Sequence, residues 1–244
     1  NRSIGRNAAI RLARNELIAS TDAGCELDPN WLQKITEPFD RSPLVDFVGG
    51  WYQPKIVTGW DASLAAVLGF VVKRVNTKTF LPSTRSMVFR KSLWQTVGGF
   101  DERNSHSEDT PFSLNMRKAS SRFVFVPDAI VHWSLVQSYR ALYRTIARYA
   151  LGDGEQRLWI SQYRLLSLGV LVEIALIVAG FMFSPLLWLL GILCFLGYLY
   201  LPLVTTHYPR RARSFYQIPL MKKMIILGNL SGFYRGLFRH HTPS

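Results

Sequence analysis

The pattern of apolar and polar positions changes its character along the chain. Up to about residue 134, short apolar runs alternate with helical periodicities and polar loops. Strands that alternate with helices predict an α/β domain built on a mixed sheet. Strands are expected at residues 17–20, 45–53, within 83–90, at 122–126 and at 129–133, the last two separated by a turn at Pro127–Asp128. Helices are expected at residues 2–14, 29–39, 61–75, 91–97, 111–119 and 138–150.

Three of these helices have recognisable ends. Asp28 can cap the helix at 29–39, and Pro29 suits its first turn. The pair Gly98–Gly99 fits the C-terminus of the helix at 91–97. The stretch 152–154, with two glycines around Asp153, is expected to end the helix that begins at residue 138.

The second part of the chain is almost uniformly apolar. The 40 residues 165–204 contain one ionisable side chain, Glu173. Apolar runs of about 18 residues or more indicate membrane spans, so two spans at about 165–183 and 186–204 predict a hairpin broken at Ser184–Pro185. An acid inside a span usually has a partner.

Basic residues flank this hairpin. Arg140, Arg144 and Arg148 recur every four residues, which favours an amphipathic helix at the membrane interface. Arg157 and Arg164 precede the hairpin, and Arg210, Arg211 and Arg213 follow it. The positive-inside rule therefore predicts a multi-pass protein of the cell membrane with its sheet domain and C-terminus in the cytoplasm. Residues 215–238 predict a surface-lying helix or a re-entrant segment, with a third span as the weaker alternative.

These patterns predict four regions. They are a sheet domain at 1–134, an interfacial helix and linker at 135–163, two transmembrane helices at 164–206, and a basic cytoplasmic or interfacial tail at 207–244.

Composition narrows the class of protein. Hydrophobic residues make up 48% of the chain, which excludes a disordered protein. The 29 Lys and Arg against 16 Asp and Glu give a net charge of +13, and the cationic flanks of the apolar part point to lipid headgroups before nucleic acid. No nucleic-acid-binding motif supports the alternative of a basic nucleic-acid binder. Cys25 and Cys194 form neither a disulfide framework nor a metal-binding spacing.

Three polar positions in the sheet domain are candidates for chemistry. Asp22 follows a strand, where open α/β sheets bind ligands, and it could bind a divalent cation or cap a turn. Glu108 and Asp109 begin a helix, where acids favour the helix dipole and one acid could also act as a general base. His132 near a strand end could contact a metal, although a lone histidine beside aromatic residues is more often structural.

Six segments, taken in order, resemble the family 2 glycosyltransferases of the GT-A fold. The resemblance covers roughly residues 1–154, and the hairpin that follows is similar to that of many membrane-associated bacterial members. The segments are Arg6–Ile10, Thr21–Leu32, Ser86–Arg90, Val97–Glu102, Glu108–Thr110 and Phe125–His132.

The resemblance implies an inverting, metal-assisted transfer of a sugar from a nucleotide-diphosphate sugar to a lipid-linked or polysaccharide acceptor. In that family's terms, Asp109 would be the general base beside Glu108, while Asp22 and His132 would hold Mg²⁺ or Mn²⁺. The donor would be bound by Arg6, Asn7, Arg85 and Arg140. The alternative is a non-catalytic, membrane-bound component that binds sugar nucleotides or serves in glycan export or assembly.

Two departures from the family pattern bear on these expectations. The family's metal motif is commonly Asp-x-Asp, and here Gly24 takes the place of the second acid, which His132 or water could replace. The family's first strands are also missing, so the chain resembles an N-terminally truncated member, and activity is expected of the complete protein rather than of this piece alone. The proposed roles require Asp22, Asp109 and His132 to converge at one cleft.

Overall fold

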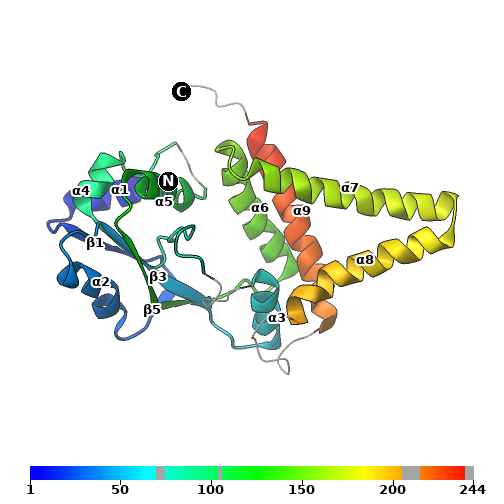
Figure 1. Cartoon of the computed structure of the whole chain (residues 1–244), viewed down its shortest axis with the longest axis horizontal. Coiled ribbons are helices and arrows are strands. Elements are labelled where there is room, and N and C mark those ends of the chain that lie inside the picture. Colours follow the sequence, from blue (N-terminus) through cyan, green and yellow to red (C-terminus); the bar gives the residue numbers. More distant parts are fainter. Residues whose placement is uncertain (70–74, 104–105, 205–214, 240–244) are drawn as a thin grey trace. The chain divides into compact units, whose positions relative to one another are not determined.

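The computed structural model describes residues 1–69, 75–103, 106–204 and 215–239, which form two compact units (Figure 1). Unit 1 comprises Asn1–Lys55 and Phe70–Leu135, and unit 2 comprises Ile56–Gly69 and Val136–Ser244. Residues 56–69 therefore belong with the helical second unit, although the sequence pattern placed them in the sheet domain.

Unit 1 is built on a five-stranded mixed sheet, as predicted. The strands lie in the order β1-β4-β3-β5-β2, in which β3 and β5 are parallel and the other neighbours are antiparallel. Their bounds are β1 Leu17–Ser20, β2 Cys25–Leu27, β3 Phe47–Pro54, β4 Met87–Arg90 and β5 Phe123–Trp133.

Both faces of this sheet are covered by helices. Because successive side chains on a strand point to opposite faces, Phe47 and Phe89 lie in one buried cluster and Val48 and Val88 in the other. The helices α1 (Arg2–Leu12), α4 (Lys91–Thr96) and α5 (Asp109–Ala119) cover the first face, and α2 (Trp31–Arg41) covers the second. Each large apolar side chain buried in this way stabilises the fold by about 1.5–3 kcal/mol.

Unit 1 differs from the predictions at three places. The strand β2 was not predicted, because three residues are too short to show alternation. Residues 123–133 form one strand, so the turn expected at Pro127–Asp128 is wrong: the register passes from Gly50↔Val126 to Trp51↔Ile130, and the residues between them bulge out of the ladder. The cap position of α2 is Asn30, not Asp28.

Unit 2 is helical. Its elements are α3 (Gly59–Leu68), α6 (Tyr139–Glu155), α7 (Ile160–Met182), α8 (Pro185–Val204), a 3₁₀ turn (Phe215–Gln217) and α9 (Ile218–Leu237). Helix α3 begins at Gly59, two residues earlier than predicted, because Thr58 and Asp61 form a capping box. The predicted end of this helix, at residues 70–75, lies largely outside the described residues.

The helix α6 continues through residues 152–154, so the prediction that these glycines end it is wrong. Gly154 serves close packing against α9 instead. A Cβ atom at Gly154 would overlap the Phe233 carbonyl, and one at Gly232 of α9 would overlap the Ala147 carbonyl. The contacts of Gly228 with Tyr143 and of Gly236 with Leu151 repeat the pattern at intervals of four residues, so α6 and α9 run parallel, side by side (Figure 1). We call these glycines the glycine seam: Gly154, Gly228, Gly232 and Gly236.

The predicted hairpin is present as the paired helices α7 and α8, which turn at Phe183–Ser184 (Figure 1). Within the described residues, α7 is the one helix long and apolar enough to cross a membrane, and almost none of its apolar stretch is buried. Glu173 has a partner: Lys223 of α9 donates to it at 3.1 Å. Arg210, Arg211 and Arg213, which supported the predicted topology, lie outside the described residues.

The glycine seam leads to a stability prediction. Gly232→Ala places a methyl group against the Ala147 backbone, so we expect it to lower the free energy of unfolding by about 1–3 kcal/mol. The matched control is Gly169→Ala in α7, where a Cβ atom meets nothing within 4 Å, so stability should stay unchanged or rise by up to about 1 kcal/mol. Thermal unfolding of the purified protein distinguishes them, and equal effects of the two substitutions would contradict close packing at the seam.

Candidate active site

Pairing of β1 with β4 brings the candidate residues together. Because the two strands are antiparallel, with Ser20 opposite Met87, the residues after β1 lie beside those before β4. The Ser20 hydroxyl donates to the Thr84 carbonyl at 3.0 Å and joins these two loops. Asp22 thus lies next to the loop Ser83–Arg85.

Asp22 is surrounded by cationic and hydroxyl donors. Arg6 Nη2 donates to its Oδ1 at 2.7 Å, and the Thr84 hydroxyl donates to the same oxygen at 3.3 Å. Arg85 Nε lies 3.6 Å from its other oxygen, Oδ2. Both oxygens of Asp22 therefore face guanidinium groups.

The two acids at the start of α5 lie beside these groups. Glu108 is buried, and its Oε1 accepts a hydrogen bond from Arg6 Nη1, so Arg6 bridges Glu108 and Asp22. Within the described residues, Glu108 Oε2 has no hydrogen-bond partner. The Ser83 hydroxyl donates to Asp109 Oδ2 at 3.0 Å. Below, the charge cluster means Arg6, Asp22, Arg85, Glu108 and Asp109.

The environment of Asp109 favours its protonated form. Removal from water raises the pKa of this carboxyl above its ordinary value, and the nearby charges of Glu108 and Asp22 act in the same direction. The positive charge of Arg85 and the hydrogen bond from Ser83 oppose this increase. A raised pKa is what a carboxylate needs if it is to take a proton from a hydroxyl group near neutral pH.

Two aromatic rings hold the Arg85 guanidinium. Its central carbon lies 5.6 Å from the centre of the Tyr52 ring and 5.4 Å from that of Trp133. These cation–π contacts fix the plane of the guanidinium group. The sequence analysis missed both rings, as well as Ser83 and Thr84. The signal that could have found the two hydroxyl residues is the polar run that directly precedes the apolar strand β4.

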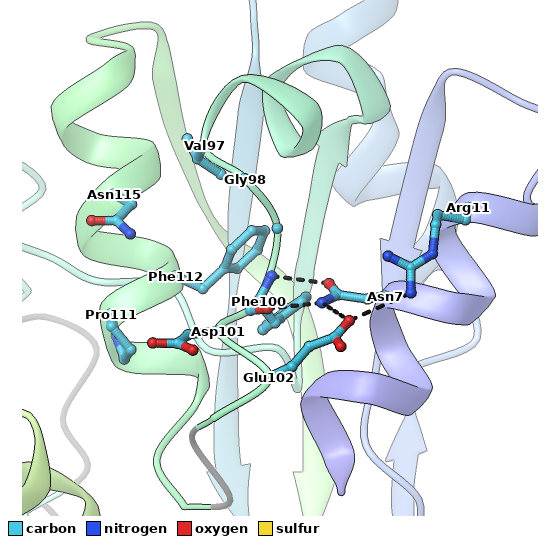
Figure 2. Close-up of a pocket in the computed structure, with 11 residues that line it drawn as sticks. Asn7, Arg11, Val97, Gly98, Phe100, Asp101, Glu102, Pro111, Phe112 and Asn115 are labelled. Carbon is cyan, nitrogen blue, oxygen red and sulfur yellow. Dashed lines mark hydrogen bonds and ion pairs between the residues drawn. The ribbon is translucent and has the colours of Figure 1, made fainter. Parts of the chain in front are cut away.

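Asn7 has a different role from the donor binding that the resemblance implied. Its amide donates to the Phe100 carbonyl at 2.8 Å and to Glu102 at 2.9 Å, and its oxygen accepts from the Phe100 N–H at 2.9 Å (Figure 2). The same oxygen accepts from the Trp94 N–H at 3.2 Å. These bonds leave the amide no capacity for a ligand. Asn7 therefore fixes α1 to the turn that follows α4.

That turn depends on glycine. Gly98 and Gly99 have φ values of +79° and +73°, in the region that favours glycine. A Cβ atom at Gly99 would lie 2.8 Å from the Asn7 oxygen. The turn lines a cavity of about 350 Å³ together with residues of α1 and α5, among them Asn7, Pro111 and Asn115 (Figure 2).

His132 does not join the charge cluster in any contact that the described residues make. Its Nε2 lies 2.9 Å from Asp28 Oδ1. Neighbouring side chains on a strand point to opposite faces, so His132 points away from the face on which Trp133 meets Arg85. Arg140, the other predicted donor-binding residue, is an exposed residue of α6 in unit 2.

The residues present do not fit a divalent-cation site. In the described part of the chain, no three His, Cys, Asp or Glu side chains are grouped in a way that could hold a metal ion. Asp22 is bound by arginines, Gly24 has no carboxylate to offer, and His132 lies against Asp28. The assignment of Asp22 and His132 as metal ligands stays a prediction that this geometry does not support.

The comparisons with known proteins agree with this fold. The family model described as "Glycosyl transferase family group 2" matches residues 18–208. The mannosyltransferase PcManGT from Pyrobaculum calidifontis, solved in complex with GDP-Man and Mn²⁺, is 15% identical with a TM-score of 0.58, and the match covers 94% of this chain and 66% of that chain. At this identity, the likeness shows the fold alone, which is mixed α/β and GT-A-like.

A second solved structure, S. aureus TarS 1–349 in complex with UDP, is 15% identical with a TM-score of 0.42. The match covers 62% of this chain and 45% of that chain. This chain thus spans about half to two-thirds of the length of these two structures. No curated protein matches the sequence.

The bonds of Asn7 lead to a prediction about stability. Asn7→Ala leaves the buried Trp94 N–H and the Phe100 backbone groups unpaired, so we expect the free energy of unfolding to fall by about 2–4 kcal/mol. Asn30→Ala is the matched control, because this exposed asparagine makes no side-chain cap bond and should change stability by less than about 0.5 kcal/mol. Thermal unfolding measures both, and a small effect at Asn7 would contradict its role as a clamp.

Proposed function

Because this chain belongs to the glycosyl transferase family group 2, we propose that it transfers a sugar from a nucleotide-diphosphate sugar to an acceptor hydroxyl, with inversion at the anomeric carbon. Unit 1 is the catalytic domain in this proposal. The observation that carries it is the convergence of Asp22, Glu108 and Asp109 with two arginines at the edge of the sheet.

Four members of the charge cluster have a role in the proposed reaction. Asp109 accepts the proton of the acceptor hydroxyl as its oxygen attacks the anomeric carbon. Arg6 and Arg85 bind the diphosphate that departs, because guanidinium groups suit phosphate oxygens. Glu108 is buried and holds Arg6 in place for this contact.

The aromatic and hydroxyl groups around the cluster keep it in place for this reaction. Tyr52 and Trp133 fix the plane of Arg85, and Ser83 holds Asp109 at 3.0 Å. Such preorganised charge, in a site partly removed from water, is usually the largest single contribution to catalysis.

We further propose that the protein acts at the cytoplasmic face of a membrane, on a lipid-linked or polysaccharide acceptor. The exposed apolar surface of α7 supports this proposal, as does the adjoining helix α8. Arg157 and Arg164 line a cavity of about 750 Å³ with Trp159 near the start of α7, a combination that suits the interface with lipid headgroups. Both spans of the hairpin, and hence the multi-pass topology, belong to this proposal.

The first test of the proposed function removes the base. Asp109→Asn should lower the transfer rate of the complete protein about a hundredfold or more, while the affinity for the donor changes only a few-fold. The rate is measured as release of nucleoside diphosphate with UDP-, GDP- and dTDP-sugars in parallel. Asp40→Asn, the same change on the exposed surface of α2, is the control and should leave the rate unchanged.

Two outcomes of this test would count against the proposal. Unchanged turnover of Asp109→Asn would contradict the base assignment. Donor binding without any turnover by the wild-type protein would favour the alternative of a sugar-nucleotide-binding component of glycan export or assembly.

The second test uses pH. A base works when deprotonated, so the rate should fall as the pH drops through the pKa of Asp109, at a pH above the ordinary aspartate value of 3.8. Ser83→Ala removes a hydrogen bond that favours the charged form, so it should move this acid limb to higher pH. Ser92→Ala is the control, because Ser92 donates to the remote Glu16. An acid limb that does not respond to Ser83→Ala would contradict titration of Asp109.

A further inference from the structure

We propose that this protein binds its nucleotide-diphosphate sugar, and stabilises the departing nucleoside diphosphate, without a divalent cation. Arg6 and Arg85 supply the positive charge instead. The inference rests on the proposed function and specifies how the donor is held. It starts from a disagreement: the fold suggests a metal site, but the side chains present are arranged as a guanidinium site.

The charges of the site balance without a metal ion. Three carboxyl groups, those of Asp22, Glu108 and Asp109, lie beside the guanidinium groups of Arg6 and Arg85. A third guanidinium, that of Arg2, lies 3.8 Å from Glu108. Divalent cations are held by a surplus of carboxylate oxygens. In this cluster Asp22 and Glu108 already have cationic partners, and Asp109 accepts a hydrogen bond from Ser83.

The position two residues after Asp22 lacks the second ligand that a cation would need. Gly24 is exposed, has a φ of +84°, and a Cβ atom placed there would meet nothing within 4 Å. This φ favours glycine, so the backbone conformation accounts for the residue, and the position offers no carboxylate to a cation. A diphosphate held by arginines needs no acid at this position.

The arginines can bind a ligand and keep their present bonds. Arg6 donates through one Nη atom to Glu108 and through the other to Asp22, which uses two of its five N–H groups. Its side chain is 21% exposed and that of Arg85 is 23% exposed, so each side chain is partly open to solvent. Asp22 and Glu108 then serve to orient the arginines rather than to hold a metal ion.

The transfer step balances in this scheme. A bond forms between the acceptor oxygen and the anomeric carbon, and the bond from that carbon to the phosphate oxygen breaks. The electron pair of the broken bond stays on the diphosphate, whose added charge faces Arg6 and Arg85. The acceptor proton goes to Asp109. Fixed guanidinium groups can stabilise such a leaving group because they are charged before the reaction begins.

The test measures binding and turnover separately in the complete protein. Calorimetry with UDP, GDP and dTDP is run in EDTA and in Mn²⁺, and transfer from the corresponding sugars is followed in the same two buffers. We expect affinity and rate in EDTA to lie within about threefold of those in Mn²⁺. Arg85→Gln and Arg6→Gln should each weaken nucleotide binding in EDTA about tenfold or more, the loss expected for a charge-assisted contact.

Three controls keep the result interpretable. Arg41→Gln removes an exposed arginine whose ion pair is with Glu37, one turn away on α2, and it should leave binding unchanged. Arg85→Lys keeps the charge but loses the planar fork, so it should recover part of the affinity that Arg85→Gln loses. Thermal unfolding of each variant excludes loss of the fold, which is a particular concern at Arg6 because Glu108 is buried.

The outcomes separate this inference from the proposed function. Binding or transfer that requires Mn²⁺ would overturn the inference and leave the proposed glycosyltransferase function standing. Full affinity of the well-folded Arg85→Gln and Arg6→Gln variants in EDTA would also overturn it. Absence of binding by all three nucleotides in both buffers would overturn both proposals.

Discussion

The bridge that Arg6 makes between Asp22 and Glu108 is the interaction on which the arrangement of unit 1 depends. It joins the end of β1 to the start of α5, two points that are far apart in the sequence. Glu108 is almost completely buried, and an unpaired buried carboxylate would cost several kcal/mol. The pairing therefore fixes where α5 begins, and with it the position of Asp109.

Two neighbouring residues of α1, Arg6 and Asn7, together position the site. Asn7 fixes the helix to the turn after α4 through four hydrogen bonds, and the clamp sets where Arg6 lies. The glycines of that turn are required because a side chain at Gly99 would collide with the Asn7 amide. The resemblance implies that Arg6 and Asn7 both bind the donor. In the structure, Asn7 fixes the helix in place and the neighbouring Arg6 faces the site.

The sequence pattern predicts most of the fold, because burial on two faces of a sheet imposes an alternation that is visible without coordinates. It fails where an isolated residue type has two physical uses. Gly152 and Gly154 read as helix terminators, but α6 continues through both, and the backbone of α9 approaches so closely that Gly154 must be small. Likewise, Pro127 reads as a turn and instead lies in a bulge within β5.

The candidate site was predicted in the same uneven way. The resemblance identified the acids and Arg6 by their order along the chain, whereas Tyr52 and Trp133 become neighbours of Arg85 only through strand pairing, which local sequence does not reveal.

An ion pair between two helices likewise decides whether Glu173 can be tolerated inside a membrane. A partly exposed ion pair with Lys223 is worth little in water, but in hydrocarbon an unpaired acid is costly. If α7 crosses a membrane as proposed, α9 must stay beside it for the acid to be tolerated. The parallel packing of α9 on α6 then holds α9 in the position from which Lys223 reaches Glu173.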